Sequence, residues 1–161
     1  MKAEFRKINA FDVPYLELLL YETVFVLDDE PMPDRSVLET ERYKKYIHPW
    51  HDEDIGYIAI DSMTSEAIGA VWLKFFTKDA PGEAYINDKL PELTIVIDGA
   101  YRNKGIGTDL VHYLMAQLPA SVHGICLSVD VRDPALDFFE RLGFVAFKVE
   151  KTNVILRYDR H

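Results

Sequence analysis

The stretch that decides the fold is "GAYRNKGIG", residues 99–107, which holds three glycines and two cations in nine residues. An apolar run, "LTIVI" (93–97), precedes it, and an apolar pattern, "TDLVHYLMAQL" (108–118), follows it. The run predicts a strand, and the pattern predicts a helix with one apolar face. The first amide groups of a helix lack intrahelical partners and carry the positive end of the helix dipole. We therefore predict an anion site at this turn, for a phosphate or a pyrophosphate.

The residue types in the turn support this prediction. Gly105 and Gly107 let an anion approach the backbone closely, and Arg102 and Lys104 add charge-assisted hydrogen bonds. The alternative interpretation is a tight basic turn without a ligand. Two other phosphate-binding motifs are disfavoured, because no Gly-Lys-Ser/Thr sequence is present and Leu110 stands where a dinucleotide-binding motif has its third glycine.

The rest of the chain predicts a mixed α/β (α+β) fold, with about six to seven strands in one mixed sheet flanked by about four helices. Hairpins in such a sheet are antiparallel, and strands joined through a helix are parallel. No repeat, low-complexity segment or linker divides the chain, so we expect one domain over residues 1–161. Strands are expected at 3–8, 56–61, 67–76, 92–97, 124–131, 145–150 and 153–158, and helices at 12–25, 34–47, 107–118 and 134–142.

Composition narrows the class of partner and the location. The chain has 27 acidic against 18 basic residues, for a formal net charge of -9, which disfavours a broad nucleic-acid surface and favours cationic partners. Cys126 is the single cysteine, so no intramolecular disulfide is expected, and its apolar neighbours favour a core residue over a catalytic thiol. The sequence shows neither a signal peptide nor a membrane span, so we expect a cytoplasmic protein without a membrane partner.

Two motifs resemble the GNAT N-acetyltransferase superfamily. "RNKGIG" (102–107) is similar to its Arg/Gln-x-x-Gly-x-Gly signature, with Gly99 where many members have proline. "SVDVRDPALDFFERLGF" (128–144) is similar to a second motif, which commonly ends in Tyr-Glu-x-Leu-Gly-Phe. Phe139 stands where the family usually has tyrosine, and Arg132 where asparagine is common. The resemblance covers about residues 92–144 and leaves out 35–47 and the loop "HPWHDED".

The resemblance implies a GNAT fold and an acetyl-CoA-dependent N-acetyltransferase that moves an acetyl group directly to an amine of a small molecule or a protein. It implies no metal cofactor and leaves a homodimer open. Asp133 is also expected to cap a helix that has Pro134 at its first position. The residues implied to bind the cofactor are Ile95, Val96, Ile97, Arg102, Asn103, Lys104, Gly105, Ile106, Gly107, Thr108 and Asp133.

Acetyl transfer to an ammonium needs a base, a donor that polarises the thioester carbonyl, and a departing thiolate. Glu92 is the candidate base, and its alternative interpretation is a solvated charge at the strand entry. A backbone N–H on the strand is the expected polarising donor. Phe139 occupies the position of the usual tyrosine acid but cannot donate a proton, and core packing is its alternative role. Tyr101, Tyr85 or water stay open as substitutes.

The acceptor site is the least constrained part of the sequence. Trp50, Trp72 and Tyr85 are its candidate residues, with His48 and His51 as further titratable candidates. We interpret the two histidines and the aspartates that follow them as a polar surface loop rather than a metal cluster. Two other functions stay open, namely a non-catalytic CoA-binding module, which Phe139 favours, and transfer of a longer acyl group.

Overall fold

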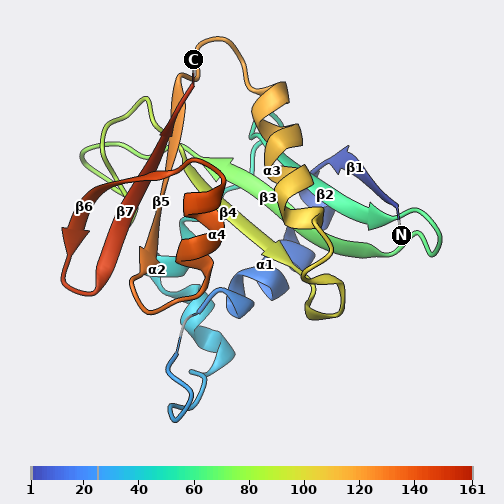
Figure 1. Ribbon diagram of the computed structural model, residues 1–161, viewed down its shortest axis with the longest axis horizontal. Helices are drawn as coiled ribbons and strands as arrows, with labels where there is room; N and C mark the ends of the chain where they lie inside the picture. The colour runs from blue at the N-terminus through green and yellow to red at the C-terminus, as the bar shows by residue number, and fades with distance from the viewer. Residues whose placement is uncertain (1, 25, 161) are drawn as a thin grey trace. The chain divides into compact units, whose positions relative to one another are not determined.

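Seven strands form one mixed sheet in the computed structural model, which describes residues 2–24 and 26–160. The hydrogen-bonded order of the strands is β1-β2-β3-β4-β5-β7-β6, and the described residues hold four α-helices, so the predicted fold class is confirmed (Figure 1). The chain divides into two compact units within strand β4 (Glu92–Ile97). Unit 1 runs up to Leu73 and includes Thr94–Leu118, and unit 2 comprises Lys74–Leu93 and the chain from Pro119 onward.

The strands of unit 1 form an antiparallel meander that ends beside β4. β1 (Ala3–Lys7) pairs with β2 (Gly56–Asp61), and β2 pairs with β3 (Ala67–Lys74), so the predicted hairpin is confirmed. The backbone N–H of Asp98 donates to the carbonyl of Ile68 at 2.8 Å, which holds the end of β4 beside β3.

Two helices of unit 1 pack on opposite faces of these strands. Helix α1 (Val13–Glu22) buries leucines in a core with Ile58 and Trp72. Helix α3 (Ile106–Gln117) places the ring of Tyr113 against Phe5 and Tyr57, with centroid distances of 5.2 and 4.9 Å. Because side chains alternate along a strand, Tyr57 and Ile58 point to different faces of β2.

The expected single helix over residues 34–47 is wrong. The segment forms a 3-10 helix, η2 (Arg35–Glu39), and a single turn of α-helix, α2 (Glu41–Lys44). Thr40 separates them with extended backbone angles, φ −75° and ψ 152°, and its hydroxyl donates to the carbonyl of Val37 at 2.6 Å. This local hydrogen bond competes with helix continuation. The first helix also ends earlier than expected, at Glu22, and the predicted last residue, Phe25, lies outside the described residues.

Unit 2 combines a parallel strand pair with a helix and a terminal hairpin. The start of β4 runs parallel to β5 (Gly124–Asp130), with Glu92 opposite Cys126, and α4 (Ala135–Arg141) follows β5. β7 (Asn153–Asp159) lies between β5 and β6 (Val145–Glu150) and is antiparallel to both. Cys126 is completely buried, as expected for a core residue.

Candidate functional site

The turn before α3 adopts the left-handed backbone conformation at two residues. Asn103 has φ 61° and Gly105, the N-cap of α3, has φ 81°. Glycine adopts this conformation without steric cost, and asparagine tolerates it. A Cβ atom added at Gly105 would meet nothing within 4 Å, so the backbone at this point is open. The first intrahelical hydrogen bond, from the N–H of Asp109 to the carbonyl of Gly105, measures 3.1 Å, and the amide groups before Asp109 are the unpaired ones of the helix end.

Both cations of the turn lie at the surface of unit 1. The Nε of Arg102 donates to the carbonyl of Ile97 at 3.1 Å, and one of its terminal nitrogens lies 4.0 Å from the Glu22 carboxylate. The Nζ of Lys104 lies 5.8 Å from the ring centroid of Tyr101. The Arg102 side chain is 56% exposed, and an exposed ion pair of this length contributes little to stability. An anion at the turn therefore meets only weak competition for Arg102.

Tyr101 anchors the turn to the sheet of unit 1. Its hydroxyl donates to the Asp61 carboxylate at 3.1 Å, and this hydrogen bond is the main reason that the pKa of Tyr101 is raised. The side chain of Asp98 accepts from the N–H of Ala100 at 3.1 Å and closes the preceding 3-10 turn, η3 (Gly99–Tyr101). The proton of Tyr101 is therefore already engaged, and its role as a substitute acid stays a prediction.

Strand β4 leads into this turn and is partly buried near its end. Val96 is buried in the core under α1, and Ile95 and Ile97 are half-buried. A Cβ atom added at Gly69 would lie 2.8 Å from the carbonyl oxygen of Val96, so β3 backs this strand tightly. The structure thus brings the strand and turn residues predicted to bind the cofactor into one continuous segment, and their binding role stays a prediction.

Tyr15 is a residue of unit 1 that the sequence did not indicate. Its ring packs against the core that contains Val96. Within residues 2–24 and 26–160, its buried hydroxyl finds no hydrogen-bond partner. Burial, followed by the charges of Asp98 and Glu22, raises the pKa of Tyr15 to about 12, so the hydroxyl stays protonated at neutral pH.

The two tryptophans proposed for the acceptor site belong to the core of unit 1. Trp72 is completely buried, and its indole N–H donates to the carbonyl of Tyr46 at 2.7 Å. Trp50 is half-buried and packs against the same core. Their role in acceptor binding stays a prediction, and the burial of Trp72 and its paired N–H favour a packing role for that residue.

Glu92, in unit 2, is buried rather than solvated. Its side chain is 3% exposed, so the alternative interpretation of a solvated charge at the strand entry is wrong. One carboxylate oxygen accepts from the backbone N–H of Ala84 at 3.2 Å. Burial, followed by the negative charge of Glu92, raises the pKa of the Cys126 thiol to about 12. Cys126 is therefore a protonated core thiol, and the role of Glu92 as a base stays a prediction.

Phe139 lies in an aromatic cluster of unit 2. Its ring is 8% exposed and meets Phe138 and Phe144 edge-on, with centroid distances of 5.2 and 5.7 Å. The ring of Phe144 contacts Tyr158 of β7 in turn, at 5.6 Å. These contacts fit the packing interpretation of Phe139, and its place beside a cofactor stays a prediction.

The loop before α4 is held by two aspartates. The prediction that Asp133 is the N-cap, with Pro134 at the first helical position, is wrong by one residue, although the Asp133 carboxylate does accept from the N–H of Ala135 at 2.9 Å. The helix itself begins one residue later than expected, with Pro134 as its N-cap. The guanidinium of Arg132 donates to both carboxylate oxygens of Asp130, at 2.9 and 2.8 Å, and this contact holds the pKa of Asp130 far below its usual range. The charge of Arg132 is therefore neutralised by Asp130, at a position where the family commonly has an asparagine.

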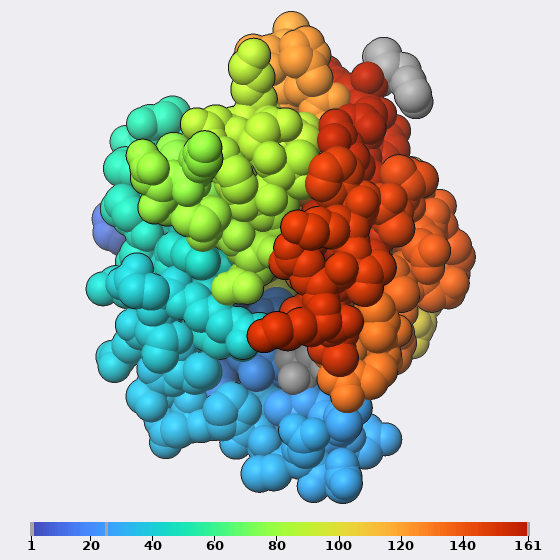
Figure 2. Space-filling model, turned by 90° about the vertical axis from the view of Figure 1, so that its left-hand side faces the viewer, coloured from blue at the N-terminus to red at the C-terminus, as the bar shows by residue number. Residues whose placement is uncertain are grey.

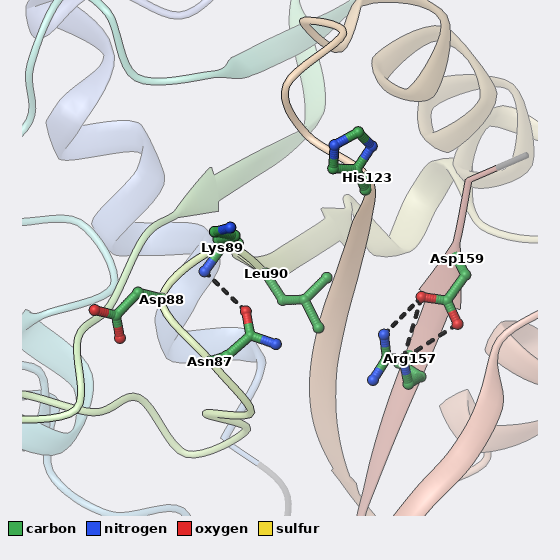
Figure 3. A pocket seen from close by; sticks show the side chains of 7 residues that line it. All are labelled: Asn87, Asp88, Lys89, Leu90, His123, Arg157 and Asp159. Carbon is green, nitrogen blue, oxygen red and sulfur yellow. Dashed lines mark hydrogen bonds and ion pairs between the residues drawn. The ribbon is translucent and has the colours of Figure 1, made fainter.

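Tyr85 lies in the β3–β4 connection, near an open pocket of unit 2. Its hydroxyl is hydrogen-bonded to Asp88, which is the main reason that the pKa of Tyr85 is raised to about 12. The pocket has a volume of about 420 Å³, and in Figure 3 the side chains of Arg157 and Asp159 point toward each other across the dashed contacts. This ion pair, at 2.7 Å, neutralises part of the lining. The pocket is lined by Asn87, Asp88, Lys89, Leu90, His123, Arg157 and Asp159.

Residues 22–144 match the model of the acetyltransferase (GNAT) family. The chain belongs to the GNAT acetyltransferase family. No curated protein sequence matches the chain significantly. The matched range of the GNAT model contains the turn at residues 99–107, Glu92 and the second motif through Phe144.

Solved structures with a similar fold include N-acetyltransferases of low sequence identity. The PaiA N-acetyltransferase from Thermoplasma acidophilum, solved with coenzyme A, has a TM-score of 0.67 and 16% identity, with 99% of each chain covered. A ribosomal-protein-alanine N-acetyltransferase from Brucella melitensis has a TM-score of 0.64 and 16% identity, covering 97% of this chain and 99% of its own. The spermidine/spermine N-acetyltransferase SpeG from Vibrio cholerae has a TM-score of 0.55 and 23% identity, covering 97% of this chain and 90% of its own. At these identities the likeness establishes the GNAT fold and not a substrate.

Neither a metal-binding cluster nor a membrane-spanning helix is found in the part of this GNAT chain that the structure describes. No group of three or more His, Cys, Asp or Glu side chains there is placed to hold a metal ion. Neither is any helix in that part long and apolar enough to cross a membrane. In the loop that contains the two histidines, the Nε2 of His48 lies 3.8 Å from a Glu17 carboxylate oxygen.

Sequence reasoning missed the residues that surround the candidate groups of this GNAT protein. Glu22 pairs with Arg102, and Ala84 donates to Glu92, yet both partners lie outside the motifs. Gly82 borders the Glu92 carboxylate so closely that a side chain does not fit there. Among these residues, only the "PG" pair at 81–82 is a recognisable sequence pattern. It predicts a turn, but it does not predict the contact with Glu92.

Proposed function

We propose that this GNAT protein is an acetyl-CoA-dependent N-acetyltransferase that transfers the acetyl group directly to an amine. The observation that carries the proposal is the open, left-handed turn at the N-terminus of α3, with Arg102 and Lys104 beside it. Such a turn suits the diphosphate of CoA, because backbone N–H groups and two cations converge on an anion. The coenzyme A bound by the structurally similar Thermoplasma protein supports this choice of ligand.

In the proposed reaction, residues 103–108 bind the diphosphate through backbone N–H groups. The strand backbone at Ile95–Ile97 aligns the acyl chain and donates an N–H to the thioester carbonyl. An acceptor amine with a pKa of about 10 is an ammonium at neutral pH, so a base must remove its proton before attack. Glu92 takes that proton, directly or through a water molecule. The neutral amine nitrogen then forms a bond to the acetyl carbon, and the carbon–sulfur bond breaks. The proton that the nitrogen loses as it becomes an amide passes through water to the departing thiolate.

The departing thiolate does not require an acid from the chain. A thiol has a pKa of about 8.5, so the thiolate is an acceptable leaving group in water. Phe139 has no proton to give, and the hydroxyls of Tyr101 and Tyr85 already donate to Asp61 and Asp88. We therefore assign protonation of the thiolate to water.

The proposed acceptor is an amine of a small molecule or of a protein. Both classes occur in the names of structurally similar proteins, one a spermidine/spermine and the other a ribosomal-protein-alanine N-acetyltransferase. The net charge of -9 favours cationic acceptors by long-range attraction. The single, buried thiol of Cys126 supports the expectation of a reducing cytoplasm.

A second candidate function is a CoA-binding module without catalysis, because Phe139 replaces the usual tyrosine and is packed among aromatic rings. An assay of thiol release separates the two candidates. The protein is mixed with acetyl-CoA and a panel of polyamines, aminoglycosides, amino acids and peptides with free N-termini, and longer acyl-CoAs are tested in parallel. We expect thiol release that depends on one class of amine. Binding of CoA with no amine-dependent release across the panel would favour the binding module.

A further inference from the structure

The carboxylate of Glu92 is enclosed by residues 82–84 of the β3–β4 connection. All of these residues belong to unit 2. In Figure 2 the connection (yellow-green) forms a continuous outer surface beside the C-terminal hairpin (red). Beneath this surface Ala84 packs with Leu90, Cys126 and Ile155 in one buried cluster. Ala84, one end of the segment that encloses Glu92, is therefore itself fixed in a core.

Gly82 is the residue that leaves room for the carboxylate. A Cβ atom added there would lie 1.9 Å from one carboxylate oxygen of Glu92 and 2.5 Å from its carboxyl carbon. It would also lie 2.6 Å from a ring carbon of Phe76. Because the Glu92 side chain is 3% exposed, the carboxylate has little space into which it can retreat. Any side chain at position 82 must therefore move the carboxylate or the connection.

Ala84 contributes a hydrogen-bond donor to the other carboxylate oxygen. Its backbone N–H lies 3.2 Å from that oxygen, and the residue is completely buried. An N–H donor at a fixed position favours the charged form of a carboxylate and holds it in one orientation. The charged form is the one that a base needs.

We propose that Gly82 and the backbone N–H of Ala84 are positioning groups for the Glu92 base. This inference rests on the proposed function, because it assigns these two groups a role only if Glu92 accepts the proton of the acceptor amine. The segment 82–84 then sets both the place of the carboxylate and its readiness to accept a proton. Neither residue belongs to the motifs that resemble the family.

The variant that tests the proposal is Gly82→Ala, compared with Ala80→Val, which adds volume at an exposed position of the same connection. We expect Gly82→Ala to lower kcat/KM at neutral pH about 100-fold, the usual contribution of a base. The acid limb of its pH–rate profile should also move to higher pH, because a displaced carboxylate loses an N–H donor to its charged form. Ala80→Val should keep the wild-type profile. A rate loss in Gly82→Ala that is equal at every pH would overturn the proposal.

A second variant covers the case in which Gly82→Ala folds poorly. The double variant Gly82→Ala/Glu92→Asp shortens the carboxylate side chain by one methylene group and makes room for the new methyl group. We expect it to recover most of the melting temperature that Gly82→Ala loses. No recovery would show that the clash lies elsewhere and would overturn the steric part of the proposal.

Glu92→Gln separates failure of this inference from failure of the proposed function. If Glu92→Gln keeps the wild-type rate at neutral pH, Glu92 is not the base, and the proposed chemistry and this inference both fail. If Glu92→Gln is slow below the pKa of the amine and recovers at high pH while Gly82→Ala behaves like wild type, only the positioning role fails. We expect the glutamine variant to be slow, and Gly82→Ala to show the shifted acid limb.

Discussion

The backbone N–H of Asp109 donates to the carbonyl of Gly105 at 3.1 Å, so α3 begins at a left-handed glycine without a side-chain cap. We expect Gly105→Ala to lower the free energy of unfolding by about 1 kcal/mol, because an L side chain is strained at φ 81°. Since no atom lies within 4 Å of the added Cβ, this cost comes from the backbone alone. Urea unfolding measures it.

Gly99→Ala is the matched control for this prediction. It lies six residues earlier in the same stretch, and its added Cβ also meets nothing within 4 Å, but its φ lies outside the left-handed region. We expect its free energy of unfolding to match that of the wild type within a few tenths of a kcal/mol. Equal losses in both variants would contradict a left-handed requirement specific to Gly105.

Tyr15→Phe should not destabilise the protein. The buried hydroxyl finds no partner in the described residues, so its removal relieves a desolvation cost of about 1 kcal/mol or more. Tyr101→Phe is the control, because it removes the hydrogen bond to Asp61 and should cost about 1 kcal/mol. Thermal unfolding of both variants at neutral pH checks the contrast. A clear loss of stability in Tyr15→Phe would mean that the hydroxyl binds an internal water molecule.

The stability of the protein should fall in alkaline solution partly through Cys126. Burial, and then the charge of Glu92, raises the pKa of this thiol from 9.0 to about 12. Between these values the unfolded state loses the thiol proton and the folded state keeps it, so stability decreases as pH rises. This group contributes about 1.4 kcal/mol per pH unit in that window and nothing below it. Urea unfolding of Cys126→Ala at several alkaline pH values should show a slope shallower by this amount, and an unchanged slope would refute the assignment.

Phe139→Tyr should cost stability without a gain in turnover. The ring is 8% exposed and is packed against Phe138 and Phe144, so a new hydroxyl enters an aromatic cluster. An unpaired buried hydroxyl costs about 1–3 kcal/mol. Melting temperature and turnover on the best acceptor measure both effects. Faster turnover at an unchanged melting temperature would instead place residue 139 beside the reacting sulfur.

The fold of this chain follows from its sequence wherever the signal is local and repeated. The strand predicted at 145–150 and the helix predicted after the glycine-rich turn are present in the structure almost to the residue. The prediction of one helix over residues 34–47 was wrong because the apolar spacing there resembles that of a helix. Thr40 instead takes an extended conformation and donates a hydrogen bond to the carbonyl of Val37. The position of β7 between β5 and β6 was not specified, because strand pairing depends on contacts far apart in the sequence.

The candidate site follows from the sequence only in part. The turn 102–108 is contiguous, so its residues are neighbours in any fold. The surroundings of Glu92 are not contiguous, because the N–H of Ala84 and the bare backbone of Gly82 reach it through the β3–β4 connection. Burial of Trp72 depends likewise on a partner 26 residues away, the carbonyl of Tyr46. The residue types alone indicated the chemical group at Glu92 and Trp72, but they did not indicate which residues surround it.

Binding of CoA at the turn before α3 is the central claim, and calorimetric titration of CoA into the wild type and Gly107→Glu tests it most directly. A glutamate in the first turn of α3 suits the helix dipole, so the variant should fold, but its charge and bulk oppose a diphosphate at the backbone. Met63→Glu adds the same charge at a side chain that is 85% exposed and serves as the control. We predict one CoA bound per chain by the wild type and by Met63→Glu, and no binding by Gly107→Glu. Absence of binding to the wild type at millimolar CoA, or equal binding to all three proteins, would contradict the claim.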